Sequence, residues 1–207
     1  KSFSKTIEVE KSNFAEAIAK QFSGLKVGID DVKQVILKSK LNFEKPNSWN
    51  EEQIISFARD LRKISKPMII AANKVDRLNG KDNFERVKEE FDYPIVACFA
   101  EGELALKEAD KHGIIDYIPG DDTFEVKKEI GENQKLALES IKKIIKEYGS
   151  TGVQDVLNKI IFDVLKYVAV YPAGSKLVDS KGNVLPDCFL MPPNSTALNF
   201  AFRLHTD

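Results

Sequence analysis

The feature that most constrains the fold is an unbroken apolar run at residues 68–72, which follows Pro67 and leads directly into the polar tetrapeptide Asn-Lys-Val-Asp at residues 73–76. A short apolar run without polar alternation is typical of a strand that is buried on both faces of a parallel sheet. In open α/β sheets, ligands bind where the carboxyl ends of the strands lie. We therefore expect the tetrapeptide to border a ligand-binding crevice.

The aspartate of this tetrapeptide, Asp76, suits a guanine base. Its carboxylate can accept hydrogen bonds from both the N1–H and the exocyclic amine of guanine, whereas adenine would present a lone pair to it. A site built around such donors can reject an analogue that lacks them by a factor of about 10⁴ or more. The alternative is a polar strand-to-helix loop in which Asp76 is only a turn residue.

Residues 1–66 have the pattern of helices. We expect the first helix to start at Asn13, the second at Asp30, and the third at a capping box, Ser-Trp-Asn-Glu, at residues 48–51. Apolar residues follow each start at helical spacing, so each helix has a stripe that needs a partner surface. The stretch at residues 41–47 is predicted to be a connector within this helical layer.

Residues 67–112 alternate between strand and helix patterns. After the first strand, we expect a helix from Asp82, a second strand at residues 94–99, and a helix from about Gly102 that Gly113 ends. Strand, helix, strand, helix in succession indicates a parallel sheet. Because two strands alone do not make a stable doubly wound sheet, we expect its other strands to come from elsewhere in a longer protein.

Helices are predicted again from residue 113 to residue 165. A long helix at residues 133–148 would end at Gly149, and Thr151 with Gln154 would cap a second helix that packs antiparallel to the first. Beyond a boundary near residue 166, strands are expected at residues 167–171 and 188–191, with a turn at 179–183 between them. A last helix, capped by Ser195 or Thr196, completes half of a β-grasp unit.

Composition limits the classes of protein and of partner. The chain has 207 residues, of which 43% are hydrophobic and 30% charged, which is enough for one large or two small domains. Its net charge of −1 does not indicate nucleic acid or an anionic membrane as a partner. Cys98 and Cys188 are widely separated, which argues against zinc, a redox motif or a disulfide framework and favours the cytoplasm. Since no apolar run or leader suits a membrane, we expect no membrane partner.

Four stretches resemble the YchF branch of the Obg-related GTPases, in its archaeal form. They are Lys-Pro-Met-Ile-Ile-Ala-Ala-Asn-Lys-Val-Asp at residues 66–76, Asp-Tyr-Ile-Pro-Gly at 116–120, Gly-Ser-Thr-Gly-Val-Gln at 149–154, and Gly-Asn-Val-Leu-Pro at 182–186 with Ala-Phe-Arg-Leu-His-Thr-Asp at 201–207. The resemblance covers nearly the whole chain.

The resemblance implies an α/β fold: the C-terminal half of a P-loop GTPase domain with largely helical parts and the start of a β-grasp TGS domain. Residues 1–66 would be a helical region, 67–112 the guanine-binding half of the G domain, 113–165 a helical extension, and 166–207 a partial, ubiquitin-like TGS domain. The chain begins with Lys1 and contains no Gly-x-x-x-x-Gly-Lys-Ser/Thr motif. We therefore expect the phosphate-binding loop to precede Lys1 in a longer protein.

The resemblance also assigns site residues. Asn73 would brace the loop and touch the purine edge, the stem of Lys74 would lie along the ring, and Asp76 would read guanine, which favours GTP. The next guanine-contacting motif of GTPases, Ser-Ala-Lys, corresponds to Phe-Ala-Glu at residues 99–101. Ala100 would still offer its backbone N–H to the guanine oxygen, although the serine that steadies this loop is missing.

Two function classes stay open. In the first, the full-length protein binds GTP with Mg²⁺ and hydrolyses it; the Mg²⁺ ligands and the water-positioning residues would precede Lys1, so no residue of this chain is expected to be catalytic or to bind a metal. In the second, the TGS unit and the helices form a non-catalytic module that binds RNA or the ribosome.

Other candidate residues have a simpler interpretation. His112 and His205 could be general bases. For His112, a cation that interacts with the dipole at a helix C-terminus is favoured, and the same interpretation is favoured for His205, near the end of the sequence. The acidic residues at 121–125 could bind a metal, but a solvated loop is favoured. The lysines at 127–146 could face RNA, but interleaved glutamates favour an ordinary charged helix face.

Overall fold

The computed structural model describes residues 13–172, 178, 182 and 188–204. It divides into two compact units, Lys1–Pro67 and Met68–Asp207, each of which is described by itself. The boundaries expected near residues 112 and 166 lie inside the second unit and stay predictions. The first twelve residues, most of the turn expected at 179–183, and His205 lie outside the described residues.

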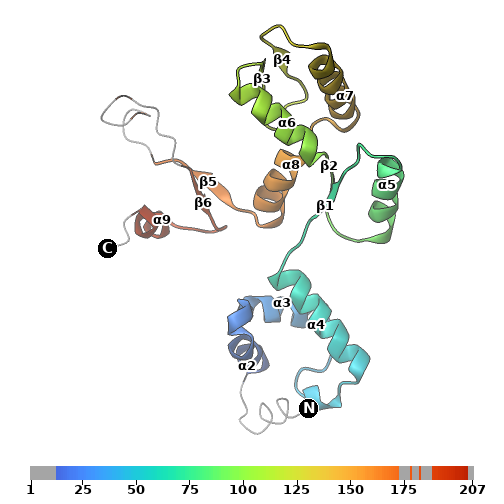
Figure 1. Ribbon diagram of the computed structural model, residues 1–207. Helices are drawn as coiled ribbons and strands as arrows, with labels where there is room; N and C mark the ends of the chain where they lie inside the picture. Colours follow the sequence, from blue (N-terminus) through green and yellow to red (C-terminus); the bar gives the residue numbers. More distant parts are fainter. Residues whose placement is uncertain (1–12, 173–177, 179–181, 183–187, 205–207) are drawn as a thin grey trace. The chain divides into compact units, whose positions relative to one another are not determined.

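The described part of the first unit is helical (Figure 1). It contains α2 (Phe14–Gln21), α3 (Ile29–Lys38) and α4 (Glu51–Ser65). Their apolar stripes meet in one core, and four aromatic rings of that core have centroids 5.2 to 6.0 Å apart. These rings belong to Phe14, Phe43, Trp49 and Phe57. Each predicted helix of this region is therefore present and packs as its stripe requires.

The helix starts differ in detail from the prediction. Asn13 caps α2 as expected, since its Oδ1 accepts the N–H of Ala15 at 3.0 Å. The second helix, α3, begins after Gly28 rather than at Asp30, because the Asp31 carboxylate accepts the N–H of Gly28 at 2.9 Å. Neighbouring aspartates both suit a helix start, and only the folded backbone decides which of them reaches the free N–H.

The start of α4 is also displaced. Asn50 and Gln53 exchange side-chain-to-backbone hydrogen bonds of 2.9 Å in each direction, so they form the capping box. Ser48 was expected in that role, but it lies in the turn Pro46–Ser48 and its hydroxyl donates to the carbonyl of Lys45 at 2.7 Å. The predicted helix is present, and its cap is two residues further on.

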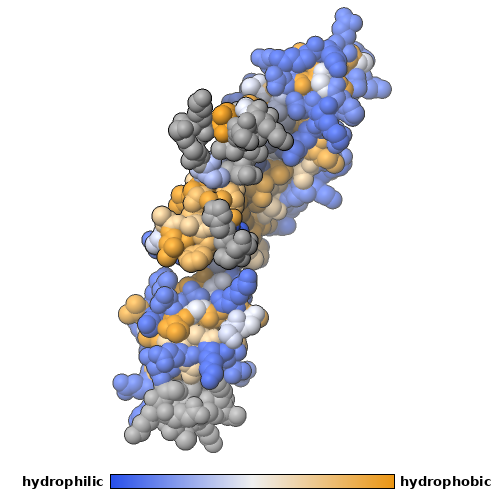
Figure 2. All heavy atoms as spheres, turned by 90° about the vertical axis from the view of Figure 1, so that its left-hand side faces the viewer, coloured by the Kyte–Doolittle hydropathy of each residue, from blue (hydrophilic) through white to orange (hydrophobic). Residues whose placement is uncertain are grey.

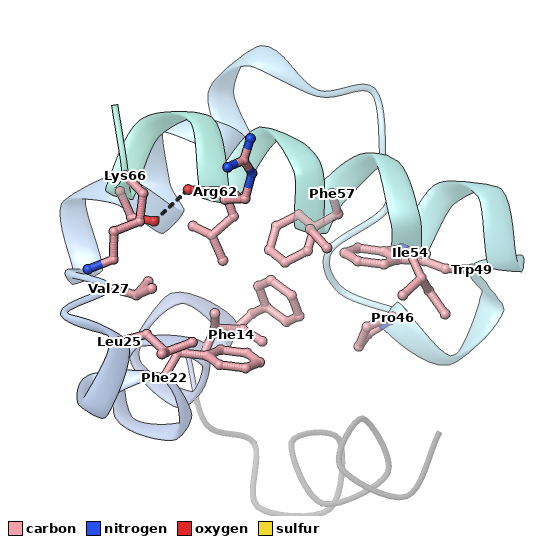
Figure 3. A pocket seen from close by; sticks show the side chains of 14 residues that line it. Phe14, Phe22, Leu25, Val27, Pro46, Trp49, Ile54, Phe57, Arg62 and Lys66 are labelled. Atoms are coloured by element: carbon pink, nitrogen blue, oxygen red, sulfur yellow. Dashed lines mark hydrogen bonds between the residues drawn. The ribbon is translucent and has the colours of Figure 1, made fainter. Parts of the chain in front are cut away.

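An apolar cavity of about 500 Å³ lies in the first unit between α2 and α4 (Figure 3). Phe14 and Phe22 line it from the side of α2, and Trp49 and Phe57 line it from the side of α4. None of the four residues predicted to bind nucleotide lines this cavity. Its lining suits apolar packing rather than a charged ligand.

The second unit contains the predicted parallel pair of strands. Strand β1 (Ile70–Asn73) and strand β2 (Ile95–Cys98) pair in parallel, with Ile70 beside Ile95 and Asn73 beside Cys98. Helix α5 (Gly80–Glu90) connects them, and α6 (Ala100–Lys111) follows β2. The predicted order of strand, helix, strand and helix is confirmed.

The prediction that β1 is buried on both faces is wrong. Ile70 and Ala72 are half-buried, while Ala71 and Asn73 are exposed. Within the described residues β1 pairs with β2 alone, so its second edge has no strand partner. The apolar run predicts a strand correctly, but its degree of burial depends on neighbours that lie elsewhere in the fold.

A second core forms around α6. Strands β3 (Ile115–Asp116) and β4 (Glu125–Val126) make a short antiparallel pair that the sequence did not predict. Together with α6 and α7 (Glu132–Tyr148), this segment buries six residues: Leu106, Ile115, Tyr117, Phe124, Ile141 and Ile145. As predicted, α7 ends at Gly149, which has a φ of 89°. Figure 1 shows β3, β4 and α7 next to α6.

Helix α8 (Val153–Asn158) packs against β2 rather than forming the expected antiparallel pair with α7 (Figure 1). It continues into a wider helical turn, Lys159–Val164. Strands β5 (Val168–Val170) and β6 (Phe189–Met191) then pair antiparallel, and α9 (Ala197–Leu204) follows. The observed order of strand, strand and helix agrees with the prediction.

Hydrophobic side chains gather on the exposed face of this last segment (Figure 2). They include Val168 of β5, Leu190 of β6, and Leu198 and Phe202 of α9, all of which are exposed. Among the described residues, no helix combines the length and the apolar character that crossing a membrane requires.

Candidate functional site

The residues after β1 and after β2 come together at one edge of the parallel sheet. Because Asn73 and Cys98 are neighbours in register, the loops that follow them leave the sheet at the same place. The side chain of Asn73 joins these loops: its Oδ1 accepts the N–H of Lys74 at 2.9 Å and the N–H of Ala100 at 3.2 Å. Three of the four residues predicted for the site therefore share one hydrogen-bonded cluster.

The backbone of the loop at residues 74–80 is closely packed. Lys74 has a φ of 69°, in the left-handed region, and the buried Val75 donates its N–H to the carbonyl of Cys98 at 3.3 Å. Gly80, the first residue of α5, lies against this loop; a Cβ there would be 2.6 Å from the carbonyl oxygen of Val75 and 2.7 Å from that of Lys74. The loop is thus held both to β2 and to the start of α5.

Asp76 lies beside this cluster with an ion-pair partner. Its carboxylate is 3.3 Å from Nε of Arg77, and 17% of its side chain is exposed. The guanidinium of Arg77 also contacts Glu101 of α6 at 2.7 Å. Arg77 and Glu101 are both largely exposed, so the ion pair between them is weak. A carboxylate with one partner keeps further acceptor capacity.

Ala100 is the first residue of α6, and its N–H is already donated to Asn73. A guanine oxygen would therefore have to share or replace that bond. The N–H groups of the first helical turn have no partner within the helix, and the residue before α6, Phe99, makes no side-chain capping bond. Phe99, in place of the usual serine, lies on Gly102, where an added Cβ would overlap its ring. The ring packs against the second core.

A third segment, which sequence reasoning missed, completes this edge of the sheet. The N–H of Phe99 donates to the carbonyl of Thr151 at 2.8 Å, and a Cβ on Gly152 would overlap the carbonyl oxygen of Ala97. The thiol of Cys98 donates to the carbonyl of Gly152 at 3.5 Å. The loop at residues 149–152 therefore lies directly on the carboxyl end of β2.

The predicted capping role of Thr151 is wrong. Gly152, with a φ of 80°, is the residue that precedes α8, and the hydroxyl of Thr151 donates instead to the Glu103 carboxylate at 2.6 Å. Tyr117 donates its hydroxyl to the same oxygen at 2.7 Å. Glu103 is only 5% exposed and Thr151 only 1%. These residues form a buried polar cluster, which we call the Glu103 cluster.

Burial and the hydrogen bond to Glu103 raise the pKa of Tyr117 to about 12, so the phenol stays a hydrogen-bond donor. No local sequence signal identifies Glu103, because an acidic residue in the first turn of a helix is ordinarily solvated. The only hint is that Tyr117 and Thr151 both lie in stretches that resemble the GTPase family. In the cluster, one residue from each of these two stretches donates a hydrogen bond to the same atom, Oε2 of Glu103.

The other candidates have ordinary surroundings. His112 is the residue that follows α6, and its side chain is exposed. Its Nε2 lies 3.8 Å from a carboxylate oxygen of Glu108, as is ordinary for a residue at a helix end. In the described part of the chain, no group of three or more His, Cys, Asp or Glu side chains is placed to hold a metal ion, and this includes the acidic residues at 121–125. Lys127 and Lys135 make ion pairs with nearby acidic side chains, which agrees with a charged surface.

Comparison with known proteins gives one consistent result. Residues 71–174, which include all four predicted site residues, match the family model of the G4 motif-containing domain of YGR210-like, Obg-like GTPases. A GTP-binding protein of Methanocaldococcus jannaschii is 43% identical over 201 residues, which cover 96% of this chain and 50% of that protein. A GTP-binding protein of Schizosaccharomyces pombe is 26% identical over 203 residues, 90% of this chain and 48% of its own length.

A solved structure has the same fold. The crystal structure of a GTP-binding protein from Pyrococcus horikoshii matches with a TM-score of 0.70 and 37% sequence identity, covering 100% of this chain and 55% of the crystallised one. The present chain thus spans about half the length of the relatives it matches.

Proposed function

The chain belongs to the Obg-like GTPase family, and from that premise we propose that it supplies the base-recognition half of a GTP site. In this proposal Asp76 accepts the two guanine donors, the stem of Lys74 lies along the purine ring, and Asn73 holds the two loops together. The full-length protein binds GTP with Mg²⁺ and hydrolyses it, with the phosphate-binding part lying outside residues 1–207.

One observation carries this proposal: Asn73 joins the loop that contains Lys74 to the first residue of α6 at the carboxyl edge of a parallel sheet. This is the edge where α/β sheets bind ligands. Asp76 lies in the same loop, and in this proposal the base takes the place of its exposed partner, Arg77. The N–H of Ala100, now bonded to Asn73, is the donor that a guanine oxygen would recruit.

The experiment uses the full-length protein and the substitution Asp76→Asn. An amide in place of the carboxylate suits xanthine better than guanine, so the variant should lose GTP affinity and gain affinity for xanthosine triphosphate. Each change should be about 10- to 100-fold, as for a lost or gained bidentate pair. Isothermal titration calorimetry with both nucleotides measures the two affinities.

Asp121→Asn is the matched control, because Asp121 lies in an exposed loop. It should leave both affinities unchanged. If Asp76→Asn behaves like the control, the proposed base recognition is wrong. Residues 1–207 alone should bind GTP weakly or not at all, since phosphate and Mg²⁺ contacts supply most of the affinity in such sites; micromolar binding would contradict this.

The finer assignments rest on the resemblance and on the order of elements. They are membership of the YchF branch, a TGS unit in residues 166–207, and an association with translation. The order of β5, β6 and α9 supports a partial β-grasp unit. A second candidate function, a module that binds RNA or the ribosome, is favoured by the exposed apolar residues of this segment, such as Phe202.

A further inference from the structure

The Glu103 cluster lies next to the base-recognition loops but contains none of the residues proposed to touch the base. One carboxylate oxygen, Oε2 of Glu103, accepts two hydroxyl donors, from Thr151 at 2.6 Å and from Tyr117 at 2.7 Å. All three side chains are at least 95% buried. A buried carboxylate is stable only when such donors satisfy it, so the geometry of this cluster is tightly determined.

A short chain of bonds leads from the cluster to the proposed base site. The carbonyl of Thr151 accepts the N–H of Phe99 at 2.8 Å, and Phe99 is followed by Ala100. Ala100 donates to Asn73, which also holds the N–H of Lys74. The bond to Thr151 is therefore made one residue before the N–H of Ala100. Tyr117 makes no backbone bond to this chain: its own N–H donates to Asp110, about two helical turns beyond Glu103 in α6.

We propose that Glu103 is a positioning residue for guanine recognition: through the hydroxyl of Thr151 it holds the loop at residues 149–152 on the end of β2, and so fixes the Ala100 N–H beside the base. This inference rests on the proposed function and deepens it. The Glu103 carboxylate does not touch the nucleotide.

The two donors of Glu103 provide a matched pair of variants for the test. Thr151→Val and Tyr117→Phe each remove one hydroxyl from the same oxygen and change the side-chain volume little. If Glu103 only stabilises the fold, both variants should lower stability and leave nucleotide affinity equally unaffected. If Glu103 positions the base loop, only the Thr151 branch should matter for affinity.

The measurement is the affinity of the full-length protein for GDP and GTP by calorimetry, with urea unfolding of the same samples. Thr151→Val should weaken guanine-nucleotide binding about fivefold or more, as expected for one lost hydrogen bond. Tyr117→Phe should change it less than about twofold. Thr151→Ser, which keeps the hydroxyl, should restore affinity. Equal affinities for Thr151→Val and Tyr117→Phe would overturn the proposal.

Failure of this inference is distinguishable from failure of the proposed function. If Asp76→Asn changes the base preference while Thr151→Val and Tyr117→Phe bind alike, base recognition stands and the positioning role is wrong. If Asp76→Asn does not change the preference, the proposed function itself is wrong. Glu103→Gln, which keeps an acceptor oxygen, should fold and should weaken binding less than Thr151→Val does.

Discussion

At the scale of single residues, close backbone approach decides how the loops of the site are arranged. Gly80 and Gly152 both lie where a side chain would meet backbone carbonyl oxygens, Gly80 at the loop after β1 and Gly152 at the end of β2. Backbone atoms cannot move aside as flexible side chains can. The loops of the site can therefore keep their present positions only with glycine in these places.

This predicts the effect of Gly80→Ala. The added Cβ would push the loop at residues 74–76 away from α5, so we expect a loss of about 1 to 3 kcal/mol in stability together with weaker guanine-nucleotide binding. Gly24→Ala, where nothing lies within 4 Å, is the control and should change stability by less than about 0.5 kcal/mol. Urea unfolding and nucleotide titration check both, and similar effects for the two variants would contradict the prediction.

A second prediction at this scale concerns how the stability of the protein depends on pH through Cys98. Burial, followed by the nearby charge of Asp155, raises the pKa of its thiol from 9.0 to about 11. The unfolded chain would release this proton near pH 9, whereas the folded protein keeps it until about pH 11. The stability contributed by the protonated thiol is therefore fully present below pH 9 and is lost as the pH rises through 11.

The expected result is that only Cys188, which is exposed, reacts with a thiol reagent at pH 8, and that Cys98 reacts after unfolding. Stability measured by urea unfolding should fall between pH 9 and 11, and Cys98→Ala should reduce this fall. Fast reaction of both thiols in the folded protein at pH 8 would show that the loop at residues 149–152 does not cover β2 as described.

At the scale of elements, the order and type of most helices and strands follow from local patterns. Polar caps, apolar stripes and glycine stops predicted α2, α3, α4 and α7, and apolar runs predicted both parallel strands. The starts were less predictable, because several polar residues near a helix end suit a cap equally well. The β3–β4 pair escaped prediction because strands of two residues carry no periodicity.

The start of α4 gives a prediction at this scale. Asn50→Ala should lower the stability of the first unit by about 1 kcal/mol, because it removes the acceptor for the N–H of Gln53. Ser48→Ala removes an exposed hydroxyl outside the helix and should cost less than about 0.5 kcal/mol. Urea unfolding followed by the fluorescence of Trp49, the single tryptophan, measures both. Equal costs would mean that the cap is wrongly assigned.

At the scale of the whole molecule, two compact units with separate cores predict two separable unfolding transitions. Phe57 is buried in the first core, with its ring 5.3 Å from that of Trp49. Phe57→Ala should destabilise the first unit by about 3 to 5 kcal/mol. Leu37→Ala, at a position that is 84% exposed, is the control and should have little effect.

Two probes distinguish the units in this experiment. Trp49 fluorescence reports the first unit, and the reactivity of the buried Cys98 reports the second. Phe57→Ala should shift the fluorescence transition to lower urea and leave the Cys98 transition in place. A shared shift of both transitions would show that the two units unfold together.

The sequence by itself determined the strand, helix, strand, helix order and the tetrapeptide at residues 73–76, because both depend on residues close together in the chain. Only the tertiary structure decided that Asn73 bonds Ala100, 27 residues away, and that Thr151 bonds Glu103, 48 residues away. It also decided that β1 is partly exposed. Hydrogen bonds and burial of this kind depend on which distant segments meet, and neither spacing nor residue type specifies that meeting.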